Sequence, residues 1–238
     1  MTVKRDIIEG LKGAMPVVLA AGPFGLLFGA LAIDNGFTVG EAVLMSAMIY
    51  AGASQMVGIN LFGETIAPWL IVLSIFAVNF RHVLYSAVVG QQIRHWSAVQ
   101  RYVAFFFLID PQFAEAEKRT ETGKPLSFVW YMAVGIPIYL AWIVEGWLGA
   151  TFGSLVKNPA AYGVDFLLPI YFLGLVMGFR KRPNWLPVVA VSAVVSVGAY
   201  ALVGSPWHVS IGALAGIAAA AALANGRPDE TQSIEAAE

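Results

Sequence analysis

The feature that most constrains this chain is a series of long apolar segments, each with at most one Asp, Glu, Lys or Arg residue. An α-helix needs about 20 apolar residues to cross the hydrocarbon core of a bilayer. Six segments approach or exceed this length, and they cover residues 14–33, 42–63, 66–90, 126–150, 185–203 and 207–226. Because a helix satisfies its own backbone hydrogen bonds inside lipid, these segments predict an all-α, polytopic integral membrane protein surrounded by lipid.

Composition supports a bilayer as the solvent and excludes several functions. Charged residues make up 12% of the chain, against about 25% in ordinary soluble domains, and the mean hydropathy is +0.72. A net charge of −1 argues against a nucleic-acid partner, which would require a basic surface. The chain has no cysteine, which excludes disulfides, thiol catalysis and cysteine-based metal sites. We expect no cofactor and no metal site.

Two further segments are weaker candidates for membrane spans. Residues 166–179 are short for a span and become long enough if Asp165 and the residues before it join the helix. The segment from Val99 to Phe113 has only eight consecutive apolar residues, Tyr102 to Ile109. It could form a poor span, a broken helix or a re-entrant segment.

The distribution of Lys and Arg favours eight crossings, because basic residues near span ends prefer the cytoplasm. If residues 99–113 cross and the N-terminus is cytoplasmic, both termini lie inside. The basic residues then inside are Lys4, Arg5, Lys12, Lys118, Arg119, Lys124, Arg180, Lys181, Arg182 and Arg227. Those outside are Arg94, Arg101 and Lys157. Without that crossing, two of the basic clusters move outside.

We expect one transmembrane transporter domain over residues 1–226 and a disordered cytoplasmic tail over 227–238, which is acidic and polar. A faint internal similarity suggests two repeats, residues 12–122 and 126–226. It places Gly25 and Gly29 on Gly149 and Gly153, although membrane composition alone could produce it. Glycine and proline residues predict breaks in the first, second, fifth and sixth spans. Such breaks can mark a binding site, but close helix packing is the favoured role of any single glycine.

Polar residues inside the third span are the first candidates for a site, since ionisable groups at bilayer depth are costly. Asn79 and His82 share one helix face, while Arg81 and Tyr85 form a neighbouring face. Arg81 stays charged and could hold a carboxylate, and His82 can take a proton near neutral pH. The alternative is structural: Arg81 reaches the membrane surface and His82 is a core hydrogen bonder.

Other candidates lie in the second and fourth segments. Ser54 and Gln55 follow small residues and offer hydrogen bonds to a ligand or, equally, to another helix. Asp110 precedes a proline, which disfavours helix and frees carbonyl groups. It could pair with Arg81 or carry a proton, or lie in a loop at the inner face. Glu145 and Asp165 lie near predicted span ends, where we expect them to be solvated.

The first half of the chain resembles the AzlC family, the large subunits of bacterial branched-chain amino-acid exporters. The resemblance is carried by GPFGLLFGALA at Gly22, LMSAMIYAGASQM at Leu44, VNFRHVLYS at Val78 and FFFLIDPQFAEA at Phe105. One departure is Pro111, where the family pattern leads us to expect an acidic residue. The resemblance implies a permease of the bacterial cytoplasmic (inner) membrane that exports valine, leucine or isoleucine with a small multi-span AzlD-type subunit.

Combining residues and resemblance, we expect a mid-membrane cavity with apolar walls from the first and fifth spans. The expected substrate-binding residues are Ser54, Gln55, Asn79, Arg81 and Tyr85, and the expected proton-coupling residues are His82 and Asp110. No HExxH, GxSxG or P-loop motif is present, so we expect neither an enzyme nor direct ATP hydrolysis, and no catalytic residue. The alternative is a channel or structural membrane subunit for another small solute.

Overall fold

A computed structural model describes residues 3–62, 68–153, 166–204 and 207–224. Within these ranges the chain forms ten helices and no strand. They are α1 (Val3–Asp34), α2 (Val39–Ile49), α3 (Gly52–Phe62), α4 (Pro68–Gln92), α5 (Ala98–Phe106), α6 (Asp110–Glu121), α7 (Phe128–Phe152), α8 (Leu167–Gly178), α9 (Trp185–Val203) and α10 (Trp207–Ala224). The prediction of an all-α polytopic protein is confirmed.

Five helices have the length and composition to cross a bilayer: α1, α4, α7, α9 and α10. The remaining apolar helices are shorter, so the expected number of eight crossings stays a prediction. The predicted residues 185–203 coincide with α9, and α4 and α10 match their predicted spans closely. The expectations for Asp165, Lys157 and the 227–238 tail fall outside the described residues.

The chain divides into two compact units, residues 1–177 and 178–238. In the second unit α9 and α10 form a helical hairpin. Ser192 donates a hydrogen bond to the carbonyl oxygen of Gly212, and Ser196 donates one to that of His208. The expectations of a single transporter domain and of two sequence repeats stay predictions. The candidate site lies entirely in the first unit.

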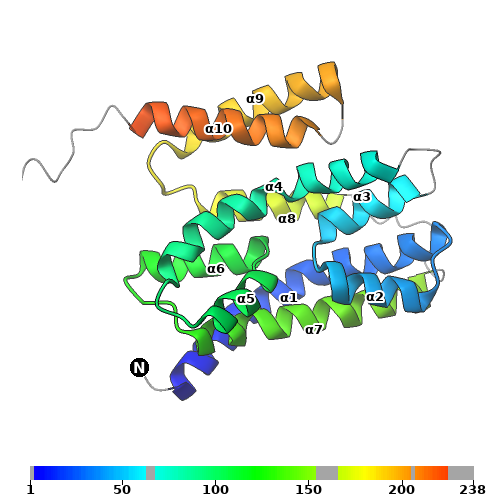
Figure 1. The fold of residues 1–238 in the computed structure, drawn as a ribbon, viewed down its shortest axis with the longest axis horizontal. Helices are drawn as coiled ribbons and strands as arrows, with labels where there is room; N and C mark the ends of the chain where they lie inside the picture. Colours follow the sequence, from blue (N-terminus) through cyan, green and yellow to red (C-terminus); the bar gives the residue numbers. More distant parts are fainter. Residues whose placement is uncertain (1–2, 63–67, 154–165, 205–206, 225–238) are drawn as a thin grey trace, which may run out of the picture. The chain divides into compact units, whose positions relative to one another are not determined.

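Helices α1 and α7 form the core of the first unit and lie side by side (Figure 1). Glycines make this approach possible, because a Cβ at Gly29 would overlap the carbonyl oxygen of Gly146, and one at Gly149 would overlap that of Leu26. Gly153 likewise faces Ala30. The packing role that we favoured for these glycines is confirmed.

The breaks expected in the first and fifth spans are wrong. Helix α1 runs through Pro16 and Pro23, and α7 runs through Pro137. Membrane helices tolerate proline when neighbouring helices satisfy the freed backbone groups, and these two helices are each other's closest neighbours. The prolines therefore leave the paired core continuous.

The second span is broken, as expected, but its break contains neither glycine nor proline. Helix α2 ends at Ile49, its C-cap Tyr50 adopts a left-handed conformation with φ 31° and ψ 47°, and α3 begins at Gly52. A non-glycine residue pays a conformational cost there. The Tyr50 ring compensates by packing edge-on against Tyr139, with 4.9 Å between ring centroids, and is 5% exposed. Aromatic packing thus fixes the break.

The fourth segment forms a broken helix, one of the three forms that the sequence left open. Helix α5 begins at a capping box between Ser97 and Gln100 and ends at Phe106. The chain is extended at Ile109, and α6 begins at Asp110 with Pro111 in its first turn. Proline is well tolerated there, because the N–H groups of a first helical turn have no acceptor within the helix. This break places Asp110 at a helix start inside the first unit.

Ion pairs join three helix ends in the same unit. The Arg119 guanidinium, at the end of α6, lies 2.8 Å from Oδ1 of Asp6 and 3.0 Å from Oε2 of Glu9, both near the start of α1. Ser127, which caps α7, donates a hydrogen bond to Asp6. The Arg119 side chain is only 4% exposed, so these pairs fix α6 and α7 relative to α1.

Candidate functional site

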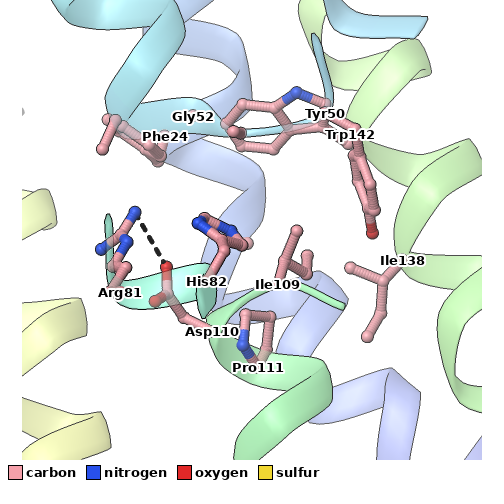
Figure 2. A pocket seen from close by; sticks show the side chains of 13 residues that line it. Phe24, Tyr50, Gly52, Arg81, His82, Ile109, Asp110, Pro111, Ile138 and Trp142 are labelled. Carbon is pink, nitrogen blue, oxygen red and sulfur yellow. Dashed lines mark ion pairs between the residues drawn. The ribbon is translucent and has the colours of Figure 1, made fainter. Parts of the chain in front are cut away.

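A pocket opens where the two helix breaks meet α1, α4 and α7 (Figure 2). Its volume is about 60 Å³, enough for a few water molecules. Its lining residues are Ala21, Phe24, Tyr50, Ala51, Gly52, Ala53, Arg81, His82, Ile109, Asp110, Pro111, Ile138 and Trp142.

Asp110 links α6 to α4 through both of its carboxylate oxygens. Oδ2 lies 3.2 Å from Nη2 of Arg81, and Oδ1 accepts a 2.8 Å hydrogen bond from the hydroxyl of Tyr85. The Arg81 and Asp110 side chains are 20% and 14% exposed. The Tyr85 ring stacks on Phe113, one turn along α6, with centroids 4.3 Å apart. The structure therefore brings these three predicted residues together, and two of them line the pocket.

His82 lines the same pocket beside Arg81 (Figure 2). Its Nδ1 lies 3.3 Å from the backbone carbonyl oxygen of Asn79, one turn earlier on α4. The imidazole also lies edge-on to Tyr85, with 5.8 Å between ring centroids. A titratable ring thus shares the pocket with a fixed cation and a carboxylate.

Ser54 and Asn79 bind each other and do not line the pocket. The Ser54 hydroxyl, 1% exposed, donates a 2.7 Å hydrogen bond to Oδ1 of Asn79. This bond ties the first turn of α3 to α4. Of the two roles left open for Ser54, the structure shows the hydrogen bond to another helix.

Gln55 is fully buried behind the pocket wall. Its Nε2 donates to the hydroxyl of Ser46 at 3.3 Å, and its Oε1 accepts a 2.9 Å hydrogen bond from Nε1 of Trp142. The Trp142 ring lines the pocket and lies 5.6 Å from the ring of Phe24. Gln55 therefore orients a wall of the pocket through Trp142.

Sequence reasoning expected apolar walls from the first and fifth spans, where Phe24 and Trp142 lie, but it did not single out the aromatic residues of this pocket. Phe24, Tyr50 and Trp142 lie within apolar runs, where an aromatic side chain carries no distinguishing signal. Only the adjoining Ala-Gly-Ala stretch at Ala51 hinted at a break. Which of many aromatic rings faces a cavity depends on the helix pairing, which the sequence leaves open.

The expectation for Glu145 is wrong. Glu145 lies in α7, seven residues before its end, and its side chain is half-buried against α1. A Cβ on Gly25 would lie 2.7 Å from Oε2 of Glu145, and one on Gly22 would lie 3.2 Å from Oε1. The close α1–α7 packing draws this carboxyl away from solvent. Among the described residues, no group of three or more His, Asp or Glu side chains has metal-binding geometry.

The electrostatics of the pocket suit a carboxylate. The starts of α3 and α6, at Gly52 and Asp110, both reach the pocket lining. Backbone N–H groups at a helix start have no acceptor within the helix and carry partial positive charge. Together with Arg81 they favour an anion, and in the structure the Asp110 carboxylate meets that preference. Phe24 and Trp142 provide an apolar surface.

Comparison with known proteins gives the family. The sequence model of the AzlC protein family matches residues 16–156, more than half of the chain. The inner membrane protein YgaZ of Escherichia coli is 29% identical over 230 residues, which cover 94% of both chains. An uncharacterized membrane protein of Archaeoglobus fulgidus is 33% identical over 82% of both chains.

The chain is also 26% identical to the branched-chain amino acid transport protein AzlC of Bacillus subtilis, over 73% of this chain and 69% of that one. No solved structure gives a significant match. The family match and the membrane-protein relatives agree with the apolar helices. The chain therefore belongs to the AzlC family and is a multi-pass transport protein of the inner membrane.

Proposed function

We propose that this chain is the permease subunit that exports valine, leucine and isoleucine from the cytoplasm. The observation that carries the proposal is one pocket lined by the cation of Arg81 and by the apolar rings of Phe24 and Trp142. Such a pocket matches an amino acid with a carboxylate and a branched apolar side chain. The name of the Bacillus subtilis relative supports the same substrate class.

The substrate carboxylate would compete with Asp110 for Arg81. In the structure Asp110 forms an ion pair with Arg81, with 3.2 Å between Oδ2 of Asp110 and Nη2 of Arg81. An incoming carboxylate can take that place, since the Tyr85 hydroxyl still holds Asp110 through its other oxygen. Asp110 would then lose its countercharge and keep only the neutral Tyr85 hydroxyl, and an unpaired charge inside the membrane is costly.

Proton coupling is part of the proposal. His82 lines the pocket beside Arg81 and Asp110, and its ring can change charge at physiological pH. A substrate that occupies Arg81 alters the charge that His82 and Asp110 experience. Proton and substrate occupancy would then be linked, with His82 and Asp110 as the proton-binding groups.

The proposal includes a small AzlD-type partner subunit. Many large apolar side chains of the first unit are exposed, among them Leu19 at 73%, Met48 at 71% and Val72 at 68%. Lipid covers such surface in any membrane protein. The partner itself follows from the family resemblance, and the reconstitution below tests it.

The test is transport in proteoliposomes. The chain is reconstituted alone and with its AzlD-type subunit, and labelled leucine is followed under an imposed pH gradient. We expect saturable movement of leucine against its concentration gradient only when both subunits are present. Full activity of the chain alone would refute the two-subunit proposal. Flux that never exceeds equilibration would instead identify a channel, the alternative function.

A further inference from the structure

Glu145 is a carboxyl group within α7, one of the helices long and apolar enough to cross a bilayer, and the proposed pocket does not use it. It lies in α7, and its carboxyl fits a notch on α1 formed by two residues without side chains, Gly22 and Gly25. A methyl group at Gly25 would come within 2.7 Å of both Cβ and Oε2 of Glu145. The glycines therefore leave a space that the glutamate fills.

In the part of the chain that the structure describes, no countercharge lies beside this carboxyl. Helix α1 has no titratable side chain between Lys12 and Asp34, and Glu41 of α2 is bonded to its own cap, Thr38. Helices α5 and α6 meet the other half of α7, through Tyr131. In the described part of the chain Glu145 has neither a hydrogen bond nor an ion pair. A carboxylate at bilayer depth without a partner is costly, whereas the neutral acid is much less so.

The notch adjoins the pocket on the same two helices. Trp142, which lines the pocket, precedes Glu145 by one helical turn on α7. On α1, Ala21 and Phe24 line the pocket, and each is followed directly by one of the notch glycines. The charged or titratable groups of that pocket are Arg81, His82 and Asp110.

We propose that Glu145 is a proton-binding site of the transport cycle, neutral in the packed notch and ionised when the adjoining pocket admits water. The inference rests on the proposed function and adds a third proton-binding group outside the pocket. Only a proton moves, between the carboxyl and water that reaches the pocket. The notch stays fixed because the α1–α7 contact is rigid, so hydration of the pocket decides when the proton leaves.

The first test uses Glu145→Gln, which keeps size and hydrogen bonding but cannot ionise. The wild-type and variant chains, each with the AzlD-type subunit, are compared in proteoliposomes. We expect the variant to keep leucine exchange within about twofold of wild type, because exchange needs no net proton movement. Leucine accumulation driven by a pH gradient should fall at least tenfold. Glu121→Gln, an exposed acid on α6, is the matched control and should behave as wild type.

Two outcomes overturn the proposal. Accumulation by Glu145→Gln at the wild-type level shows that Glu145 carries no transported proton. Loss of exchange together with accumulation, in a variant that still folds, shows a role in structure or substrate binding instead. A wild-type protein that exchanges no branched-chain amino acid refutes the proposed function itself, which separates the two failures.

A second measurement needs no substrate. Infrared difference spectra of the full chain in lipid bilayers, recorded between two pH values, report protonated carboxyl groups directly. We expect a carboxylic-acid band that is lost in Glu145→Gln and shifted in Gly22→Ala, whose methyl group would lie 3.2 Å from Oε1. A spectrum that Glu145→Gln leaves unchanged would refute the proton site whatever the substrate proves to be.

Discussion

The hydroxyl of Tyr85 lies 2.8 Å from Oδ1 of Asp110 and so holds the start of α6 against the middle of α4. The other carboxylate oxygen pairs with Arg81, four residues before Tyr85 on α4. Because Asp110 lies directly after the break in the fourth segment, this bond makes the break part of the pocket. Arg81 and Tyr85, on one face of α4, thus hold the Asp110 carboxylate in place. From the sequence alone, Asp110 could have been either a loop residue or an ion-pair partner.

Variants of the Arg81–Asp110 ion pair can distinguish a role in substrate binding from a role in stability. Arg81→Gln and Asp110→Asn each leave one partner unpaired, and removing one partner of a buried pair costs about 3–5 kcal/mol. Since both side chains keep some exposure, we expect destabilisation of about 1–3 kcal/mol for each single variant. The double variant should regain most of that stability but not transport. Thermal unfolding in detergent and leucine flux measure the two effects, and a fully active double variant would mean that the pair is only structural.

Gln55 should act through Trp142. Gln55→Leu leaves the buried Trp142 N–H without its acceptor, and an unsatisfied buried donor costs about 1–3 kcal/mol. We expect that loss of stability together with a raised KM for leucine. Gln55→Glu keeps an acceptor oxygen and should retain more of both. Tryptophan fluorescence reports the orientation of the ring, and an unchanged KM in Gln55→Leu would argue against this positioning role.

His82→Gln tests proton coupling in the pocket. Glutamine can replace the contact between Nδ1 and the Asn79 carbonyl but cannot titrate near neutral pH. We expect the variant to bind leucine and to lose its accumulation under an imposed pH gradient. Stopped-flow measurement of internal pH during leucine addition gives the second readout. If the variant still concentrates leucine as the wild type does, His82 is not a proton carrier.

The α1–α7 contact should tolerate no added atom. Gly29→Ala places a methyl group on the Gly146 carbonyl, and no side chain can give way there. Overpacking costs about 1–3 kcal/mol and more where the backbone must move, so we expect a loss of at least 3 kcal/mol or no folded protein. Gly40→Ala, whose Cβ would meet nothing within 4 Å, is the control. Equal thermal stability of the two variants would contradict the packing described.

The transmembrane topology can be read by labelling, since the natural chain has no cysteine. With both termini cytoplasmic and eight crossings, residue 121 at the end of α6 faces the cytoplasm. We expect Glu121→Cys to react with a membrane-impermeant maleimide only after the cells are opened. Labelling of intact cells would exclude the eight-crossing arrangement.

The sequence predicted what depends on local pattern. Uncharged runs gave α9 and α10 nearly to the residue, and the Asp-Pro pair predicted the break at Asp110. It failed where the outcome depends on the neighbouring helix. Pro23 lies in a continuous helix that packs along its length on α7. Glu145 is half-buried because glycines on another helix make room for it. Similarly, the pairing of Arg81 with Asp110 was one of the options that the sequence left open. Which aromatic rings line the pocket depends on how the helices pack, and the sequence does not show that.

The backbone contact between α1 and α7 bears on which parts of the first unit can move. A transporter that opens first to one side of the membrane and then to the other must keep some element still. The carbonyl oxygen of Leu26 lies where a side chain at Gly149 would be, and that of Gly146 lies where a side chain at Gly29 would be. Because the two backbones are in direct contact, α1 and α7 cannot slide or roll past each other without collision. They form a fixed axis made from segments about 120 residues apart in sequence. Ion pairs also hold α6 on α1, so the elements left to swing around that axis are the short helices α3 and α5.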